Sequence, residues 1–282
     1  MAGFWAEFRH TLRRLRGQIL GWGLGLALYG VTMGALYDTI QGIEGMEELL
    51  ASYPKELWAF FGNMSTLSTP EGYIGTYYSS YMPLIVGIFA VSVAAALLAG
   101  DEERGTLELT LAHPVSRTAL FWGRAAAFAA ALALILLIGW LGWVVTLPFT
   151  AMPVSALMVL RPFVPLWALT ALFGTLALLL SMALPSARLA SMTAGGLLVA
   201  NFLLLGLGNL NENLGRIADL TPFHFLQSGD AINGLNWGWL LGLTAAALVL
   251  AVLAWLLFLR RDIRVGGERG WGVRLIQRAG PR

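Results

Sequence analysis

The sequence lacks several groups that chemistry in proteins commonly depends on. It contains no cysteine, which excludes disulfides and thiolate metal sites. Its one lysine, Lys55, is followed by Glu56, so no Gly-Lys-Ser/Thr phosphate-binding loop is present in these 282 residues. Charged residues make up only 12% of the chain, about half the share found in soluble domains. These absences argue against an ATP site on the chain and against a water-exposed surface over most of it.

Long hydrophobic runs make up much of the sequence. Hydrophobic residues make up 57% of the chain, and a membrane-spanning helix needs about 20 of them in a row. Pro185 and Arg188 separate two runs that would otherwise join, which predicts a tight hairpin there. The predicted fold class is therefore an all-α integral membrane protein with six transmembrane helices, at 18–37, 78–99, 120–147, 163–184, 189–207 and 237–259.

The basic residues set a direction for these six spans. Fifteen of the 18 lie in segments that share one side when both termini are placed in the cytoplasm, including a basic tail at 260–282. Residues Met1 to Arg16 mix charges with aromatics and show no cleavage site, so we expect the first span to be retained. A multi-pass topology with both termini cytoplasmic is the prediction.

Ionisable side chains are missing from the centres of the predicted spans. A proton-coupled carrier or an intramembrane hydrolase needs such groups at depth. Asn201 is the main polar residue near a span centre, and a hydrogen bond between helices accounts for it. The three histidines, His10, His113 and His224, are isolated, so no metal site is expected. Any work done by these spans is expected to be driven from outside them.

The first 37 residues combine two patterns. Residues 1–17 carry Phe4, Phe8, Leu12 and Leu15 at helical spacing with charges elsewhere on the wheel, which predicts an amphipathic helix on the inner membrane surface. The alternative is a solvated basic leader that only fixes topology. The first span then repeats glycine every four residues, which lets helices approach closely. Gly17, Gly21 and Gly25 are candidate subunit-interface residues, or they pack within one subunit, as Gly30 and Gly34 also allow.

Two long segments are predicted on the outer side. Within 38–77, apolar residues from Met46 to Phe61 recur at steps of three and four, which predicts one or two amphipathic helices against the membrane, a partner, or the spans themselves. The segment 208–236 is rich in Asn, Gly and Pro and is expected to be mostly irregular, with Phe223, Phe225 and Leu226 near the interface.

The segment 100–119 is the densest cluster of charge between spans. It runs from the acidic Asp101, Glu102 and Glu103 into an apolar stretch that ends at Pro114. Leu107 and Leu111 fall on one face of a short predicted helix, with no span assigned to cover them. An apolar ridge framed by charges favours a contact with a cytoplasmic protein over an ordinary solvated connection.

The run Glu102 to Glu108 and its continuation Pro114-Val115-Ser116-Arg117 resemble the coupling-helix loop of ABC transporter permeases of the type-2 export family. Pro70-Glu71-Gly72-Tyr73 and Pro54-Lys55-Glu56-Leu57 resemble that family too, and the likeness covers nearly the whole chain. It implies a docking helix and a return into the third span formed by Glu102, Glu103, Arg104, Gly105, Thr106, Leu107, Glu108, Leu111, Pro114, Ser116 and Arg117.

The same resemblance implies the partners. The chain would be one permease half that pairs with a second half, identical or homologous, and with two copies of a cytoplasmic ATPase that binds ATP and Mg²⁺. It would sit among lipids in a bacterial or archaeal cell membrane, bind no cofactor or nucleic acid itself, and export a lipid, drug or hydrophobic peptide. Two alternatives remain: a permease serving cofactor or metal-site maturation through its outer loop, and a scaffold or sensor without transport.

Overall fold

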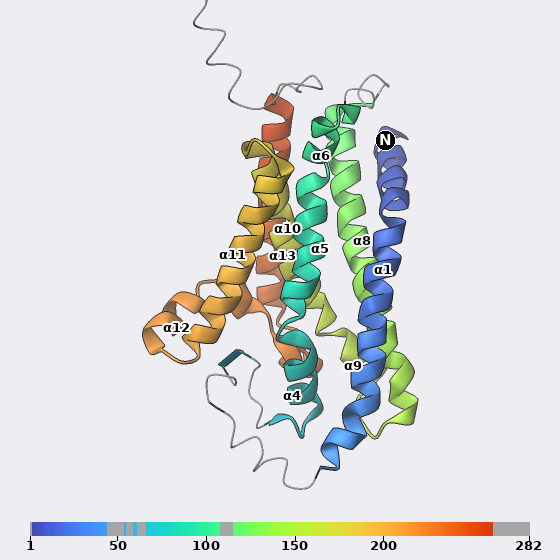
Figure 1. The fold of residues 1–282 in the computed structure, drawn as a ribbon, viewed down its shortest axis with the longest axis vertical. Helices are drawn as coiled ribbons and strands as arrows, with labels where there is room; N and C mark the ends of the chain where they lie inside the picture. Colours follow the sequence, from blue (N-terminus) through green and yellow to red (C-terminus); the bar gives the residue numbers. More distant parts are fainter. Residues whose placement is uncertain (1, 44–53, 55–58, 61–65, 108–114, 262–282) are drawn as a thin grey trace, which may run out of the picture.

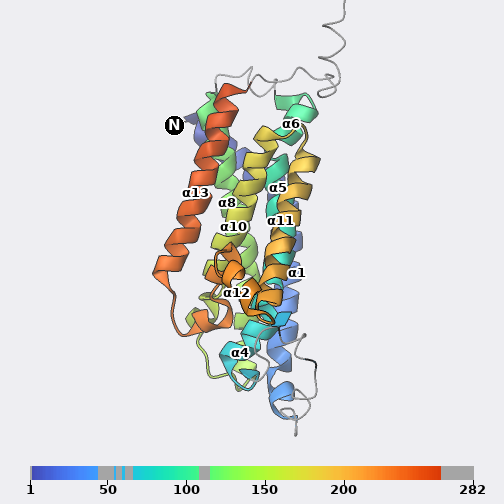
Figure 2. The same cartoon turned by 90° about the vertical axis from the view of Figure 1, so that its left-hand side faces the viewer.

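The structure, a computed structural model, describes residues 2–43, 54, 59–60, 66–107 and 115–261. Over these residues it is all-helical, and six helices are long and apolar enough to cross a membrane (Figure 1). The predicted fold class and the number of spans are confirmed. The six helices run side by side, and α6, the start of α1 and the end of α13 lie at one end of the bundle (Figure 2).

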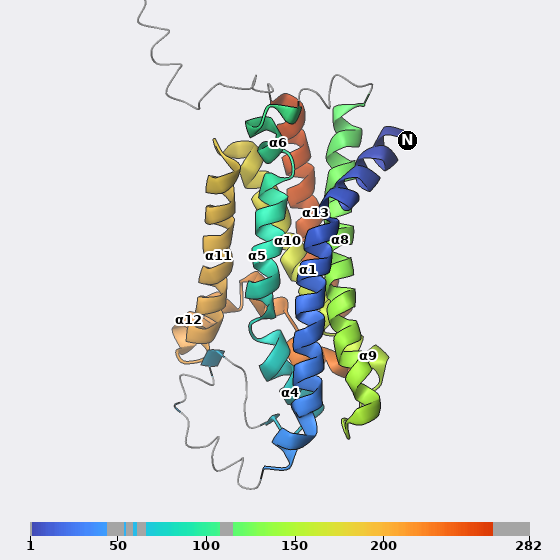
Figure 3. The same cartoon turned by 45° about the vertical axis from the view of Figure 1, so that its right-hand side comes forward.

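The first helix, α1, runs unbroken from Ala2 to Gln41. The predicted surface helix 1–17 and the predicted span 18–37 are therefore one helix of 40 residues, about 60 Å long at about 1.5 Å per residue. Its first turns bend away from the axis of the remainder (Figure 3). The hydrocarbon layer is only about 30 Å thick, so a large part of α1 extends beyond it.

The buried face of α1 differs from the predicted apolar face. Glu7, Thr11, Leu15 and Ile19 are buried, whereas Phe4, Phe8 and Leu12 are only partly buried. The four buried residues recur at i, i+4 and lie toward α8, Arg117–Thr146, which runs parallel to α1. Placing Glu7 on the polar side of the helix was wrong, because its carboxylate has a buried partner on α8.

The second span is composite. It begins with α4, Pro70–Ile74, which Thr69 caps and Pro70 opens, and continues through the π-helix η2, Gly75–Ser79. The α-helix α5, Met82–Ala96, completes it. The sequence prediction began this span at Tyr78 and assigned the turns from Pro70 to an outer loop, whereas the apolar helical segment of the structure runs from Pro70 to Ala96. A π-helical turn of this kind often marks a functional segment of a helix.

The other spans begin at side-chain caps or next to proline. Ser116 caps α8, Ser186 caps α11, Ala187–Gly208, and Asn236 caps α13, Trp237–Arg260, each by accepting a hydrogen bond from a backbone N–H. Helix α10, Phe163–Ala183, follows Pro162 and the short helix α9, Ala156–Leu160, with the 3₁₀ turn η3, Leu147–Phe149, before α9. Pro185 lies in the break between α10 and α11. Helix α10 is the most buried of the six and packs against α5, α11 and α13.

The segment 208–236 is more ordered than expected. It forms the short helix α12, Glu212–Ala218, and two 3₁₀ turns, η4 at Pro222–Phe225 and η5 at Ser228–Ile232. Asn211 caps α12, because its side-chain oxygen accepts hydrogen bonds from the backbone N–H groups of the first turn. Phe223 is buried in the protein against Phe173 and Phe202 rather than at its edge. The helices predicted between Met46 and Phe61 lie largely outside the described residues, although Phe60 contacts Phe202.

Candidate functional site

The segment predicted to dock a partner begins with a short helix, α6, Ala99–Glu103, directly after α5. Gly105 follows with φ 69°, a left-handed conformation that favours glycine, and its N–H donates to the Glu102 carbonyl at 3.0 Å. Helical geometry resumes at Thr106 and Leu107. The predicted docking residues Glu108, Leu111 and Pro114 lie outside the described residues.

Asp101 is the centre of a buried charge network between α6, α1 and α8. Its carboxylate accepts hydrogen bonds from Arg14 Nη1 at 2.9 and 3.0 Å and from Arg124 Nη1 at 2.6 Å. Arg124 also donates to Glu7 Oε2 at 3.2 Å and to the Leu97 carbonyl at 2.8 Å. The Arg124 side chain is only 2% exposed, so its charge depends on these partners rather than on water.

The next two carboxylates of α6 reach different helices. Glu102 pairs with Arg261 just after α13 at 3.2 Å, and Arg261 donates in turn to the Ser181 and Met182 carbonyls at the end of α10. Glu103 accepts the Ala187 N–H of the first turn of α11 at 2.7 Å, where the helix dipole favours a negative charge. Three consecutive carboxylates thus connect α6 to α1, α8, α13 with α10, and α11.

The remaining predicted docking residues divide between the surface and the interior. Glu103, Arg104 and Thr106 are exposed, while Leu107 is 1% exposed and packs in the hydrophobic core. Leu107 was expected on a surface ridge because no span was assigned to cover it, and the structure provides that cover within the chain. A charged substitution there would therefore disturb packing as well as any docking.

The return into the third span is held at two points. Ser116 Oγ accepts the Ala119 N–H at 3.2 Å and caps α8. Arg117 Nη1 donates to the Arg261 carbonyl at 2.9 Å and to the Leu259 carbonyl at 3.4 Å, at the end of α13. Both residues therefore fix the entry into α8 and are not free surface groups.

Sequence reasoning missed the inward role of the charges on α1 and α8. Arg14 and Arg124 were counted only among the fifteen basic residues that set the topology, and Glu7 was placed among the charges away from the apolar face of the first helix. One signal was present: Arg124 lies two turns inside α8, whose neighbouring residues are apolar. A charge there needs a partner, and the acidic run at Asp101 was the available source.

Gly105 gives a local test of this geometry. Replacing Gly105 by Ala places a Cβ on a left-handed residue, and we expect a loss of about 1–2 kcal/mol in the free energy of unfolding. The midpoint of thermal unfolding in detergent measures it. Gly196→Ala on α11 is the matched control, because a Cβ there meets nothing within 4 Å and the residue is not left-handed. Equal midpoints for both variants would contradict the left-handed assignment.

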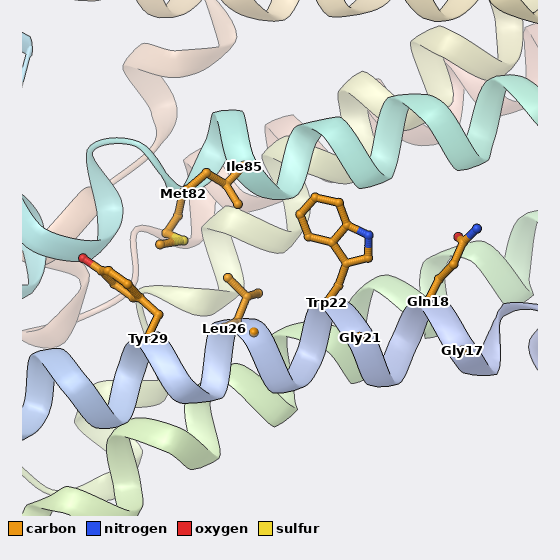
Figure 4. Close-up of a pocket in the computed structure, with 9 residues that line it drawn as sticks. Gly17, Gln18, Gly21, Trp22, Leu26, Tyr29, Met82 and Ile85 are labelled. Carbon is orange, nitrogen blue, oxygen red and sulfur yellow. The ribbon is translucent and has the colours of Figure 1, made fainter.

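A groove lies between α1 and α5 (Figure 4). It has a volume of about 490 Å³, and its middle is apolar, with Trp22 and Leu26 from α1 and Met82 and Ile85 from α5. Gln18 lies toward one end and Tyr29 toward the other. The Tyr29 hydroxyl is hydrogen-bonded to the Tyr81 hydroxyl and the Tyr77 carbonyl. The groove therefore offers a long apolar wall with polar groups at its two ends.

The glycines of α1 fall on two different faces. Gly23, Gly30 and Gly34 pack against α8, where a Cβ on Gly30 would lie 2.7 Å from Trp143 Cδ1 and one on Gly23 would lie 2.8 Å from Ile138 Cδ1. Gly17, Gly21 and Gly25 are exposed, line the groove, and have open space where a Cβ would go. Packing within this chain therefore explains the first set but not the second.

No cluster of three or more His, Cys, Asp or Glu residues able to hold a metal ion occurs within the part of the chain that the structure describes. The three carboxylates of α6 instead form ion pairs with arginines or accept a hydrogen bond from a backbone N–H. The charged end of the bundle is thus organised for helix-to-helix contacts.

The comparison with protein families agrees with this architecture. Residues 1–263 match the family model described as "ABC-2 family transporter protein". No curated protein matches the chain. The matched region includes all six spans, α6 and the α1–α5 groove. Members of this family are membrane permeases that lack the ATPase domain, and this chain belongs to the ABC-2 family of transporter proteins.

Proposed function

We propose that this chain is one permease half of an ATP-driven exporter and that α6 with the following loop is its coupling element. A second permease half, identical or homologous, and two copies of a cytoplasmic ATPase would complete the transporter. ATP and Mg²⁺ would bind to the ATPase. Family membership supports the transport class and a partner ATPase, and the α6 network supports the place of coupling.

The observation that carries the proposal is the distribution of the α6 carboxylates. Asp101 is bound to α1 and α8, Glu102 to the arginine that joins α13 and α10, and Glu103 to the start of α11. Helix α6 also follows α5 after only two residues, Leu97 and Leu98. A displacement of the loop after Glu103 would therefore act on all six spans at once, as a coupling element requires.

The proposed orientation places the α6 end of the bundle in the cytoplasm. Arg9, Arg13, Arg14, Arg16 and Arg104 belong to this end, as does Arg188 at the start of α11. A concentration of arginines at one membrane face favours the cytoplasmic side. Both chain termini would then be cytoplasmic, in a bacterial or archaeal cell membrane.

The α1–α5 groove supports an amphipathic or hydrophobic cargo. Its apolar wall suits an acyl chain, a drug or a hydrophobic peptide, and its polar ends suit a terminal polar group. The open face of Gly17, Gly21 and Gly25 would lie toward the second permease half, so that cargo is held between the two halves. Among the residues that the structure describes, no Asp, Glu, His, Lys or Arg lines the groove, which fits a cargo moved by ATP-driven rearrangement rather than by proton exchange.

Two substitutions separate docking from coupling. Glu103→Ala removes the carboxylate that holds the α11 N-terminus, and we expect the ATPase to co-purify normally while its stimulated turnover falls severalfold. Glu108→Lys reverses a charge in the proposed docking loop, and we expect less co-purified ATPase. The measurements are co-purification from membranes and ATP hydrolysis in reconstituted vesicles.

Arg216→Ala, at the other end of the bundle on α12, is the control for both variants and is expected to change neither quantity. Unchanged co-purification and turnover in both test variants would reject the coupling assignment. Loss of turnover in Arg216→Ala as well would show a general destabilisation and would also count against it.

A further inference from the structure

The arginines of α1 are divided between two environments. Arg14 is held by Asp101, whereas Arg9, Arg13 and Arg16 are exposed and have no ion-pair partner among the residues the structure describes. These three recur at steps of four and three, so they share one face of the helix. They line a second groove, which is separate from the α1–α5 groove. Its far end is formed by Ile19 and Leu20 of α1 and by Leu134 of α8.

This groove crosses the boundary between lipid headgroups and hydrocarbon. Arg16 is the last charge on α1 before an uncharged run from Gly17 to Tyr37, which is about 32 Å long and matches the hydrocarbon thickness. The three arginines therefore lie at headgroup level. Leu20 and Leu134 are 54% and 39% exposed. They lie beyond Arg16 along the groove, at the depth of the lipid acyl chains. One end of the groove is cationic and the other is apolar.

We infer that this groove binds an anionic phospholipid, with its phosphate at Arg9, Arg13 and Arg16 and an acyl chain along Ile19, Leu20 and Leu134. Charge complementarity supports this occupant, because no acidic residue of the described part of the chain lines the groove and one guanidinium can bind two oxygens of the same phosphate. Basic pockets at the cytoplasmic side of transmembrane helices suit such headgroups. The site requires only that the chain spans a membrane, and the cytoplasmic leaflet follows from the proposed orientation.

The three arginines do not belong to the charge network. By helical spacing, Arg9, Arg13 and Arg16 fall on the side of α1 opposite Glu7 and Thr11, and they are exposed, whereas the apolar end of the groove reaches α8 at Leu134. A lipid bound here would fix the depth and tilt of the first turns of α1 without competing for Asp101. The three arginines are therefore lipid-binding residues and not members of the α6 network.

Lipid binding to the purified full chain tests the inference. Native mass spectrometry with phosphatidylglycerol is expected to show tight binding, with phosphatidylcholine at least about tenfold weaker. The triple variant that combines Arg9→Gln, Arg13→Gln and Arg16→Gln is expected to lose the preference for phosphatidylglycerol over phosphatidylcholine. Arg188→Gln is the matched control, because Arg188 is an exposed arginine on α11 outside the groove. Retained preference in the triple variant, or its loss in Arg188→Gln, would overturn the site.

A second pair of measurements covers folding and ligand identity. Arg9→Lys, Arg13→Lys and Arg16→Lys combined keep the topology signal, and we expect phosphatidylglycerol to bind a few fold more weakly because the planar guanidinium is lost. A photoreactive acyl chain on phosphatidylglycerol is expected to label peptides that contain Leu20 or Leu134. Labelling elsewhere only, or displacement of the lipid by millimolar inorganic phosphate alone, would refute a phospholipid site. Normal ATPase co-purification in all these variants separates this result from the coupling proposal.

Discussion

Arg124→Ala is expected to destabilise the protein more than any other single substitution at the α6 end. The change leaves the Asp101 and Glu7 carboxylates buried without the guanidinium that joins them. Breaking a buried ion pair by removing one partner costs about 3–5 kcal/mol in the free energy of unfolding. We expect a lower midpoint of thermal unfolding in detergent and faster proteolysis of the folded protein.

Two further variants show whether the effect comes from unpaired charge. Arg124→Lys keeps the positive charge but loses the fork that reaches Glu7, Asp101 and the Leu97 carbonyl, so an intermediate loss is expected. Neutralising all three groups, as Glu7→Gln, Asp101→Asn and Arg124→Met, is expected to cost less than Arg124→Ala alone, because the effects of interacting groups do not add.

An exposed arginine provides the baseline for this series. Arg188→Ala is expected to change the free energy of unfolding by about 0.5 kcal/mol or less, as surface substitutions usually do. If Arg124→Ala behaved like Arg188→Ala, the guanidinium would have to be solvated, and the network between α1, α6 and α8 would not exist as described.

The spans were predictable because the bilayer imposes a length and a composition on them. The runs at 163–184 and 237–259 lie within a residue or two of α10 and α13, which begin directly after Pro162 and Asn236. The same hydropathy argument placed the start of the first span at residue 18. It could not detect that α1 begins at Ala2, because helical hydrogen bonding continues through charged residues that a membrane criterion excludes.

The candidate site was predictable in position but only partly in its contacts. Acidic residues beside a span end, followed by glycine, marked α6 and Gly105. The partners of those acids are distant along the chain: Arg124 and Arg14 lie 23 and 87 residues from Asp101, and Ala187 lies 84 residues from Glu103. No local pattern pairs residues so far apart. Leu107 shows a second limit of the sequence. An apolar residue in a loop does not indicate whether it is buried by its own chain or by a partner protein.

Gly142→Ala is expected to lower the free energy of unfolding by about 1–3 kcal/mol, although alanine is the better helix former. A Cβ on Gly142 would lie 2.6 Å from the Ala27 Cα, which is backbone and cannot rotate away. Helices α1 and α8 would have to separate. Thermal unfolding of the purified protein, compared with Gly21→Ala, measures the change.

Gly21→Ala is the matched control because it makes the same substitution within a span, where a Cβ meets nothing within 4 Å. There the helix propensity of alanine acts alone, so stability should stay equal or rise by up to about 1 kcal/mol. The opposite signs follow from the two faces of α1: one packs on α8 and the other lines the groove. If both variants lost stability equally, α1 would not be seated on α8 through Gly142. The Glu7–Arg124 contact depends on that same packing, so the charge network that connects α6 to the first span would then be in doubt as well.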